Sequence, residues 1–166
     1  MDPRYITPFI KSIQNVFSTM LQLEVSINEP SVNQSGKTPF DVSGIIGISG
    51  DVKGTIVLSF PNDTAQRVVA LFTGEELTSE SPDFADAIGE LVNMVSGGAK
   101  AMFDTKRASI STPSVILGGG HIVVSPRSDV PCISIPCTTD CGDLTIEIAF
   151  EVAGSEAEKN EAANAA

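Results

Sequence analysis

The sequence predicts an α+β fold in which helices pack on one face of a mostly antiparallel sheet. Patterns of helical and strand type follow one another in the order helix, strand, β-hairpin, two helices and several further strands. The expected helices are amphipathic, and turn residues join strands directly, which is typical of antiparallel pairing. With 166 residues the chain is long enough for one core and too short for two ordinary domains. We expect a single domain at 1–153 and a polar, disordered tail at 154–166.

The first part of the chain predicts a helix followed by a strand. Apolar side chains recur at helical spacing through 7–20, and Pro8 is expected at the start of this helix. Apolar and polar residues alternate within 22–33, which predicts a strand that leaves the sheet near Pro30. The residues 34–39 include Gly and Pro and are expected to form a loop.

A β-hairpin is expected next. The runs at 40–49 and 53–60 are rich in β-branched residues, and Gly50 and Asp51 lie between them. The order Gly-Asp leaves three connections open, namely a type I′ turn, a type II′ turn and a slightly longer loop.

A second helix follows the hairpin. Pro61 ends the strand, and residues 64–72 carry apolar side chains at helical spacing. Asn62 or Asp63 is expected to cap the N-terminus of this helix, and Gly74 is expected to end it.

The last third of the chain predicts strands. The run 108–117 has a strand pattern, and Pro113 within it indicates an edge position or a β-bulge. The glycines at 118–120 are expected to form a turn, because no helix follows them as a phosphate-binding loop requires. A final antiparallel pair is expected at 132–138 and 144–152.

Three cysteines lie close together in this final pair, at Cys132, Cys137 and Cys141. Their odd number, and a start of the chain that does not resemble a signal peptide, favour free thiols in a reducing compartment. Their spacing differs from that of a zinc knuckle and His121 is the sole histidine, so no metal site is expected. A serine or cysteine triad would have to use His121 as its base.

The chain is acidic, with a formal net charge of −11 at pH 7. Binding to phosphates needs clustered Lys and Arg, so we expect no nucleic-acid partner and favour a basic protein surface instead. The sequence has no apolar run of membrane-spanning length and no secretory signal at its start. We therefore expect a soluble protein of the cytoplasm without a membrane partner.

The segment 81–102 predicts one long helix with two different faces. Ser81 suits the N-cap position and Pro82 the first helical position. One stripe of this helix is expected to pack against the rest of the protein: Phe84, Ile88, Leu91, Val95, Gly98 and Met102.

The opposite stripe carries two acids, an amide and a glycine. Asp86, Glu90, Asn93 and Gly97 follow the spacing i, i+4, i+7, i+11 and so fall within a sector of about 60°. We call these four residues the acid-amide stripe. Asparagine and glycine are poor helix formers, and their presence in the middle of a helix favours contact with another molecule. A surface helix that is only solvated is the alternative interpretation.

The spacing Asp86-x3-Glu90-x2-Asn93 resembles the signature of the CheC/CheX/FliY family of bacterial chemotaxis phosphatases. The segment 109–121, SISTPSVILGGGH, is similar to the Pro-Thr-Val-Val-x-Gly-x-x-His segment of that family, with Ser114 where Thr is usual. The order of elements fits the family along nearly the whole chain. The motif occurs once, whereas CheC-type members carry two copies, so the resemblance is to single-motif members of CheX type.

The resemblance implies a phosphatase that hydrolyses the phosphoaspartate of a CheY-like response regulator. Glu90 and Asn93 are then the catalytic residues: Asn93 would hold the attacking water and Glu90 would pair with the lysine beside the phosphoaspartate. Asp86 and Gly97 are expected to contact the partner. The receiver site of the partner would supply Mg2+, so no cofactor is expected in this chain, and the resemblance also implies a homodimer.

Two other functions stay open at this point. A protein of this fold could act as an adaptor that binds a receiver domain or a flagellar switch protein without useful turnover. It could also be a structural or ligand-sensing domain whose acid-amide stripe is only solvated. The presence of both Glu90 and Asn93 favours the enzyme.

Overall fold

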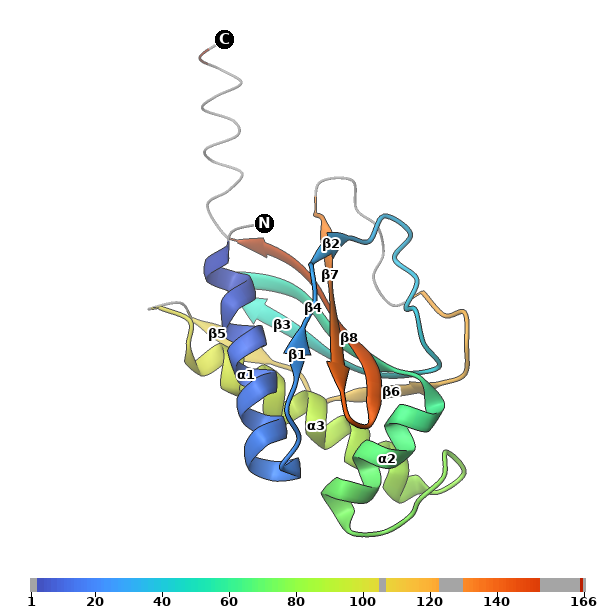
Figure 1. The fold of residues 1–166 in the computed structure, drawn as a ribbon. Coiled ribbons are helices and arrows are strands. Elements are labelled where there is room, and N and C mark those ends of the chain that lie inside the picture. Colours follow the sequence, from blue (N-terminus) through green and yellow to red (C-terminus); the bar gives the residue numbers. More distant parts are fainter. Residues whose placement is uncertain (1–2, 105–106, 123–129, 153–164, 166) are drawn as a thin grey trace.

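The computed structural model describes residues 3–104, 107–122, 130–152 and 165 (Figure 1). Within these residues the chain forms three helices and one eight-stranded sheet, which confirms the predicted α+β class. The helices are α1 Pro3–Leu21, α2 Asn62–Thr73 and α3 Pro82–Ala101. The strands are β1 Ser26–Ile27, β2 Ser31–Val32, β3 Val42–Gly50, β4 Val52–Phe60, β5 Ala108–Ile110, β6 Ser114–Leu117, β7 Cys132–Thr139 and β8 Gly142–Val152. The tail predicted at 154–166 lies outside the described residues, apart from Ala165.

The sheet is antiparallel, and its strands lie in the order β1-β7-β8-β4-β3-β5. β2 also pairs with β7, and β6 also pairs with β3, so each edge of the sheet holds two short strands. The predicted β3–β4 hairpin is confirmed, and so is the final β7–β8 pair. The last paired residues of the β3–β4 hairpin are Ile48 and Gly54, so its connection is longer than a two-residue turn.

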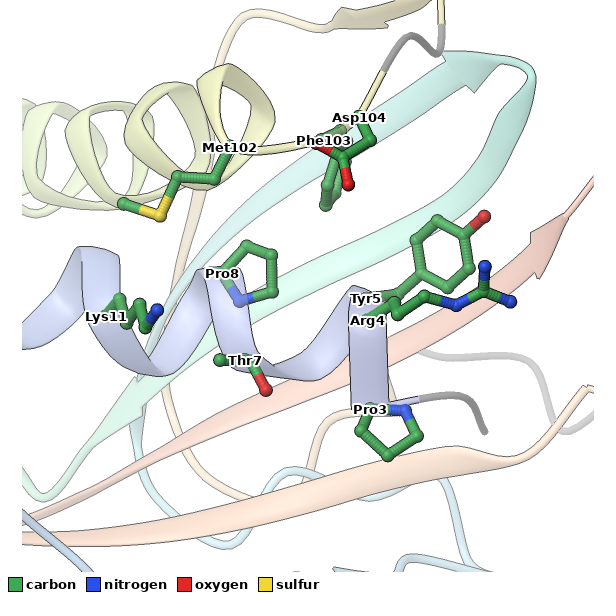
Figure 2. A pocket seen from close by; sticks show the side chains of 9 residues that line it. All are labelled: Pro3, Arg4, Tyr5, Thr7, Pro8, Lys11, Met102, Phe103 and Asp104. Carbon is green, nitrogen blue, oxygen red and sulfur yellow. The ribbon is translucent and has the colours of Figure 1, made fainter.

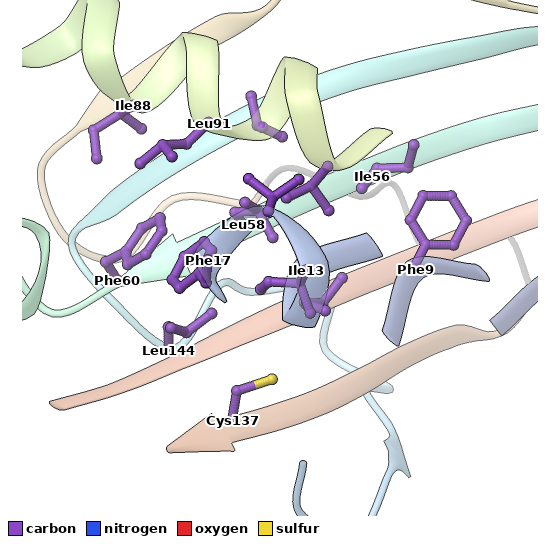
Figure 3. Close-up of a cluster of buried hydrophobic side chains, with 14 of the residues drawn as sticks. Phe9, Ile13, Phe17, Ile56, Leu58, Phe60, Ile88, Leu91, Cys137 and Leu144 are labelled. Carbon is purple, nitrogen blue, oxygen red and sulfur yellow. The ribbon is translucent and has the colours of Figure 1, made fainter. Parts of the chain in front are cut away.

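The three helices cover one face of the sheet, as predicted (Figure 1). Side chains alternate along each strand, so one set from every central strand points toward the helices. Figure 3 shows the resulting layer of buried side chains, among them Phe9, Ile13 and Phe17 of α1, Ile56, Leu58 and Phe60 of β4, Ile88 and Leu91 of α3, and Leu144 of β8. Each fully buried side chain of this kind contributes roughly 1.5–3 kcal/mol to folding. In the part of the chain that the structure describes, no helix has the length and apolar character needed to cross a bilayer.

The first helix is longer than predicted. α1 begins at Pro3, and Pro8 lies inside it instead of at its start. Pro3 can occupy the first helical position because an N–H there would have no partner within the helix. Pro8 has no N–H with which to donate a hydrogen bond inside the helix. Its ring is buried in the core. The apolar stripe itself is as predicted, since Phe9, Ile13 and Phe17 are fully buried.

The strand predicted at 22–33 is shorter in the structure. Only Ser26–Ile27 and Ser31–Val32 pair with β7, and Pro30 lies between them. Proline has no N–H to give to a ladder, so the prediction that the chain leaves the sheet there is confirmed. Leu23 and Val25 are buried without being paired. The alternation before Ser26 therefore reflects burial of side chains and not strand pairing.

The capping predicted for the second helix is half right. α2 starts at Asn62 directly after Pro61, which is the N-cap residue, and no side chain makes a cap hydrogen bond there. The expected cap by Asn62 or Asp63 is therefore wrong. Gly74 ends the helix as predicted: its φ is 77° and its N–H donates to the carbonyl of Ala70 at 2.9 Å.

The sheet face away from the helices carries buried polar side chains. Ser43, Ser59, Thr145 and Glu147 point to this face and are at most 6% exposed. The loop between β2 and β3 reaches them, because Nδ2 of Asn33 donates to Oε2 of Glu147 at 2.8 Å. Burial of these groups is compatible with folding because Ser43 bonds to Ser59 and Glu147 bonds to the loop. The hydroxyl of Thr145 has no partner among the residues that the structure describes.

Pro113 interrupts the edge strand, and the structure shows both features that it predicts. β5 and β6 form an edge of the sheet, and the edge carries one residue more between them than the facing part of β3 does. This extra residue makes a β-bulge. Ser111 holds the bulge against β3, because its N–H donates to the carbonyl of Gly47 at 2.9 Å and its hydroxyl accepts from the N–H of Gly47 at 3.0 Å.

Candidate functional site

The helix that carries the candidate site begins as the sequence predicts. The hydroxyl oxygen of Ser81 accepts a hydrogen bond of 3.3 Å from the N–H of Asp83, and Pro82 takes the first helical position. Asp83 in the first turn and Lys100 in the last turn match the helix dipole. The helix then runs without a break to Ala101, so its two stripes keep the predicted register.

The packing stripe of α3 is confirmed except at its end. Phe84, Ile88, Leu91 and Val95 are fully buried. Gly98 faces α1, where a Cβ on it would collide with the hydroxyl of Ser12. Met102 was expected in this stripe, but it is the C-cap residue and is 42% exposed. That prediction is wrong because the helix ends before Met102 could complete a further buried turn.

The acid-amide stripe lies on the solvent side of α3. Asp86 and Glu90 are exposed, and Asn93 and Gly97 are half-buried. From Asp86 to Gly97 the stripe extends about 16 Å along the helix axis. Glu90 and Asn93 are three residues apart and so lie on adjacent turns of one face, where a carboxyl group and an amide are neighbours. The structure therefore places all four predicted site residues on one accessible surface.

The glycines of α3 have different surroundings. A Cβ on Gly97 would meet only Cδ1 of Ile110, at 4.0 Å, so contacts within this chain do not require glycine at this position. A Cβ on Gly89 would lie 3.4 Å from the ring of Pro113 and 3.5 Å from Cγ2 of Val115. Gly89 precedes Asn93 by one turn, so the β5–β6 bulge borders the acid-amide stripe on the side of Asn93.

The chemistry available to the stripe follows from its side chains. Asn93 offers both a carbonyl acceptor and an NH2 donor, which is what orienting a water molecule requires. The exposed carboxyl groups of Asp86 and Glu90 suit pairing with a cation of a partner. Over the described ranges, no three His, Cys, Asp or Glu side chains are grouped so as to hold a metal ion. The stripe thus offers one amide and two exposed carboxyl groups on a single face of α3.

His121 does not form a usable nucleophilic site. Its Nε2 lies 2.9 Å from the hydroxyl of Ser43, and its Nδ1 lies 2.7 Å from the carbonyl of Gly118. Ser43 is fully buried, so a substrate cannot reach its hydroxyl. The pair connects the residues after β6 with β3, which is a structural role.

The three cysteines are free thiols, as predicted, and the structure shows that all three are buried. Burial, together with the adjacent carboxyl group of Glu147, raises the pKa of Cys132 to about 12. Burial alone raises the pKa of Cys137 to about 12. For Cys141, burial raises the pKa while Arg67 opposes the shift. Thiols with raised pKa values stay protonated at neutral pH and are poor nucleophiles, so these cysteines belong to the core.

A pocket of about 510 Å³ lies between the N-terminal end of α1 and the end of α3. Figure 2 shows its lining, to which α1 contributes Tyr5 and Lys11 and the chain at the end of α3 contributes the segment from Met102 to Asp104. Met102 follows Glu90 by twelve residues, or about 18 Å along the helix axis. The pocket is therefore separate from the acid-amide stripe.

Gly44 of β3 also lies close to the site, a position that was not predicted from the sequence. A Cβ at this position would lie 3.0 Å from Cγ1 of Val92, the residue before Asn93. The signal was present in the sequence, because a glycine inside a run of β-branched residues marks a place where another segment comes close.

Comparison with known proteins agrees with the fold and with the predicted family resemblance. The family model described as "Chemotaxis phosphatase CheX" matches residues 42–138, which include α3 and most of the sheet. A protein of Thermotoga maritima named "CheY-P phosphatase CheX" is 30% identical over 121 residues, which are 71% of this chain and 78% of that protein.

Two solved structures extend this similarity to three dimensions. A CheC-like superfamily protein from Shewanella sp. PV-4 has a TM-score of 0.82 and 32% identity, and the match covers 91% of this chain and 99% of that one. CheX from Borrelia burgdorferi, solved in a complex with CheY, BeF3 and Mg2+, has a TM-score of 0.75 and 22% identity and covers 89% and 97% of the two chains. The second likeness concerns the fold alone. With the family match over more than half of its length and the acid-amide stripe on α3, the chain belongs to the CheX family of chemotaxis phosphatases.

Proposed function

We propose that this protein hydrolyses the phosphoaspartate of a CheY-like response regulator by inserting the acid-amide stripe of α3 into the receiver site. The observation that carries the proposal is the common solvent-facing position of Glu90 and Asn93 on one rigid helix. The relative from Thermotoga maritima is named a CheY-P phosphatase, which supports the reaction class. The Borrelia burgdorferi relative was solved with CheY, which supports the partner class.

Asn93 is the residue that would hold the attacking water. Hydrolysis of an acyl phosphate needs little covalent chemistry from the protein, and the rate depends on a water placed in line with phosphorus and on balanced charge. The amide of Asn93 can accept from this water and donate to it. Its half-buried position limits the freedom of the side chain, which favours a fixed water position.

Glu90 is the residue that would anchor the helix in the receiver site. Its exposed carboxyl group would pair with the lysine beside the phosphoaspartate, and Asp86 would add a contact one turn earlier. Gly97 has no side chain, so the backbone of the partner could come close to the helix at this end of the stripe. The Mg2+ and the phosphoaspartate would both come from the receiver, so this chain would need no cofactor of its own.

The proposal also concerns the state of the protein in the cell. By analogy with CheX-type proteins, we propose a homodimer in the cytoplasm that acts within a chemotaxis or related phosphorelay. Measurement of the mass in solution by light scattering tests the dimer independently of the enzyme assay.

The experiment that tests the reaction is the release of phosphate from a phosphorylated CheY-like receiver, with the wild-type chain and with Asn93→Ala and Glu90→Ala. We expect the wild type to accelerate release and both variants to return the rate toward that of the receiver alone. Asn15→Ala is a matched control, because Asn15 is an exposed amide within α1. Loss of activity in Asn15→Ala as well would mean that the effect is not specific to the stripe.

Binding separates the two proposed roles. With a receiver held in its active form by BeF3 and Mg2+, Glu90→Ala should weaken binding, whereas Asn93→Ala should bind and fail to turn over. The adaptor alternative makes the opposite prediction for the wild type, namely tight binding with an unchanged lifetime of the phosphoaspartate.

A further inference from the structure

Gly44 is the third residue of β3 and lies directly beneath α3. Glycine weakens the interior of a strand, so its presence needs a reason. The backbone of Gly44 is not among those with positive φ, so the reason is not its conformation. A Cβ on Gly44 would lie 3.0 Å from Cγ1 and 3.1 Å from Cβ of Val92, and 3.3 Å from Cγ2 of Ile88. Gly44 is therefore explained by the small separation between β3 and α3, which leaves little room for a side chain.

The contact with Val92 is rigid. A β-branched side chain in a helix has one strongly preferred rotamer, so Val92 cannot turn its methyl groups away at low cost. Its Cβ is attached directly to the helix backbone and cannot move without the helix. A methyl group added to Gly44 would therefore push this turn of α3 away from the sheet by a few tenths of an ångström.

The neighbouring strand supports the same turn. Gly44 is paired with Val115 of β6, and Cγ2 of Val115 is 3.5 Å from the place where a Cβ of Gly89 would be. Gly89 is buried one turn before Asn93. α3 thus comes close to β3 and β6 at the turn that leads to Asn93. It can do so because neither Gly44 in the sheet nor Gly89 in the helix has a side chain.

We infer that Gly44 is a positioning residue, which sets the depth at which the backbone under Val92 holds Asn93 for water-mediated phosphoryl hydrolysis. This inference rests on the proposed function. Gly44 itself is buried beneath α3 and does not belong to the acid-amide stripe. Its effect reaches the reaction through Val92, which is adjacent to Asn93 in the chain.

Turnover and binding should respond differently to a shift of this turn. Asn93 has a short side chain and is half-buried, so it cannot compensate for movement of its backbone. Glu90 has a long, exposed side chain that can still reach a cation of the receiver. Because small misplacements of a reacting group cost rate steeply, Gly44→Ala should lower kcat by about tenfold. The KM for the phosphorylated receiver should stay within about twofold.

The control is Gly47→Ala in the same strand. Gly47 points to the other face of the sheet, where a Cβ would lie 3.7 Å from the hydroxyl of Ser111, an ordinary contact. Both variants make the same chemical change in β3, so a difference between their kcat values reports the contact with α3. Thermal melting of each variant, and its affinity for the BeF3-activated receiver, are measured beside the steady-state kinetics.

A double variant keeps the test valid if Gly44→Ala folds poorly. Val92→Ala removes Cγ1, the Val92 atom nearest to a Cβ on Gly44, and leaves the contact with Cβ at 3.1 Å. Gly44→Ala with Val92→Ala should therefore regain part of the kcat that Gly44→Ala alone loses. A folded Gly44→Ala with wild-type kcat, an equal loss in Gly47→Ala, or no recovery in the double variant would each overturn the inference. A wild-type chain without effect on phosphate release would overturn the proposed function, and with it the role of Gly44.

Discussion

The hydroxyl of Ser12 in α1 donates a hydrogen bond of 2.7 Å to the carbonyl of Val95 in α3. Both residues are buried, and Gly98 provides the room that Ser12 occupies. A side chain of α1 therefore contacts the backbone of α3, on the side of α3 that faces away from the acid-amide stripe. Any change at this contact acts on the helix that carries Glu90 and Asn93.

Gly98→Ala should destabilise the fold. Alanine is favoured over glycine by about 1 kcal/mol in an exposed helix, but the added methyl group collides with Ser12. Overpacking of this kind costs about 1–3 kcal/mol of the free energy of unfolding, measured by urea denaturation. Gly97→Ala is the control, since its Cβ has space and the variant should be neutral or slightly more stable. Equal effects of the two substitutions would contradict this account.

Asn33→Ala should destabilise the loop between β2 and β3. The amide of Asn33 donates to Glu147 and to the carbonyl of Lys37, and its oxygen accepts from the N–H groups of Ser35 and Gly36. Its removal leaves the buried Glu147 without this donor, which costs about 1–3 kcal/mol in chemical denaturation.

Asn28→Ala serves as the control for Asn33→Ala. The side chain of Asn28 makes an exposed hydrogen bond of 3.0 Å to Thr138, and its removal should change stability by no more than about 0.5 kcal/mol. If both variants lose the same stability, the burial of Glu147 is not what makes Asn33 important.

Stability should fall as the pH rises from 9 to 12. The pKa values of Cys132 and Cys137 are raised from 9.0 to about 12 in the folded protein by burial, so above pH 9 only the unfolded chain loses these protons. Deprotonation therefore favours unfolding, by about 1.4 kcal/mol per pH unit for each thiol. The unfolding free energy of the wild type should fall more steeply with pH than that of a Cys132→Ala, Cys137→Ala double variant. Parallel curves would show that the two thiols do not contribute.

Salt should weaken encounter with the receiver more than it slows turnover. The chain carries a formal net charge of −11, and Asp83, Asp86 and Glu90 are exposed on α3. Attraction between exposed charges is screened over about 10 Å at 0.1 M salt, so KM should rise with NaCl while kcat stays constant. Asp86→Asn should reduce this dependence. Asp143→Asn, at an exposed position in the β7–β8 hairpin, should retain it.

Much of the fold follows from local patterns in the sequence. The period of the apolar residues and the caps Ser81 and Gly74 place two helices, and Pro30 and Pro113 mark where pairing stops. Each of these features is local, because it depends on the backbone dihedral angles and hydrogen bonds of only one or two residues. The start of α1 was less predictable, since Pro3 and Pro8 are both compatible with a first turn.

The position of the acid-amide stripe was predictable for the same reason, since helical spacing alone puts its members on one face. The role of Gly44 was not, because it depends on which helix crosses which strand. The burial of Ser43 and Glu147 was equally out of reach. Their alternation with apolar residues is typical of a solvated sheet face. The loop that contains Asn33 and the segment that contains His121 cover that face, and neither contact is visible in local spacing.

The bulge at Ser111 limits how the sheet can grow. An open edge normally offers a row of N–H and C=O groups on which a further strand can assemble, and this is a route to aggregation. At this edge the bulge interrupts the ladder between β5 and β6, and Pro113 has no N–H to offer. An incoming strand could form a ladder only along the short β5 or the short β6. Within the described residues, the edge beside the acid-amide stripe is thus protected against the addition of a long strand.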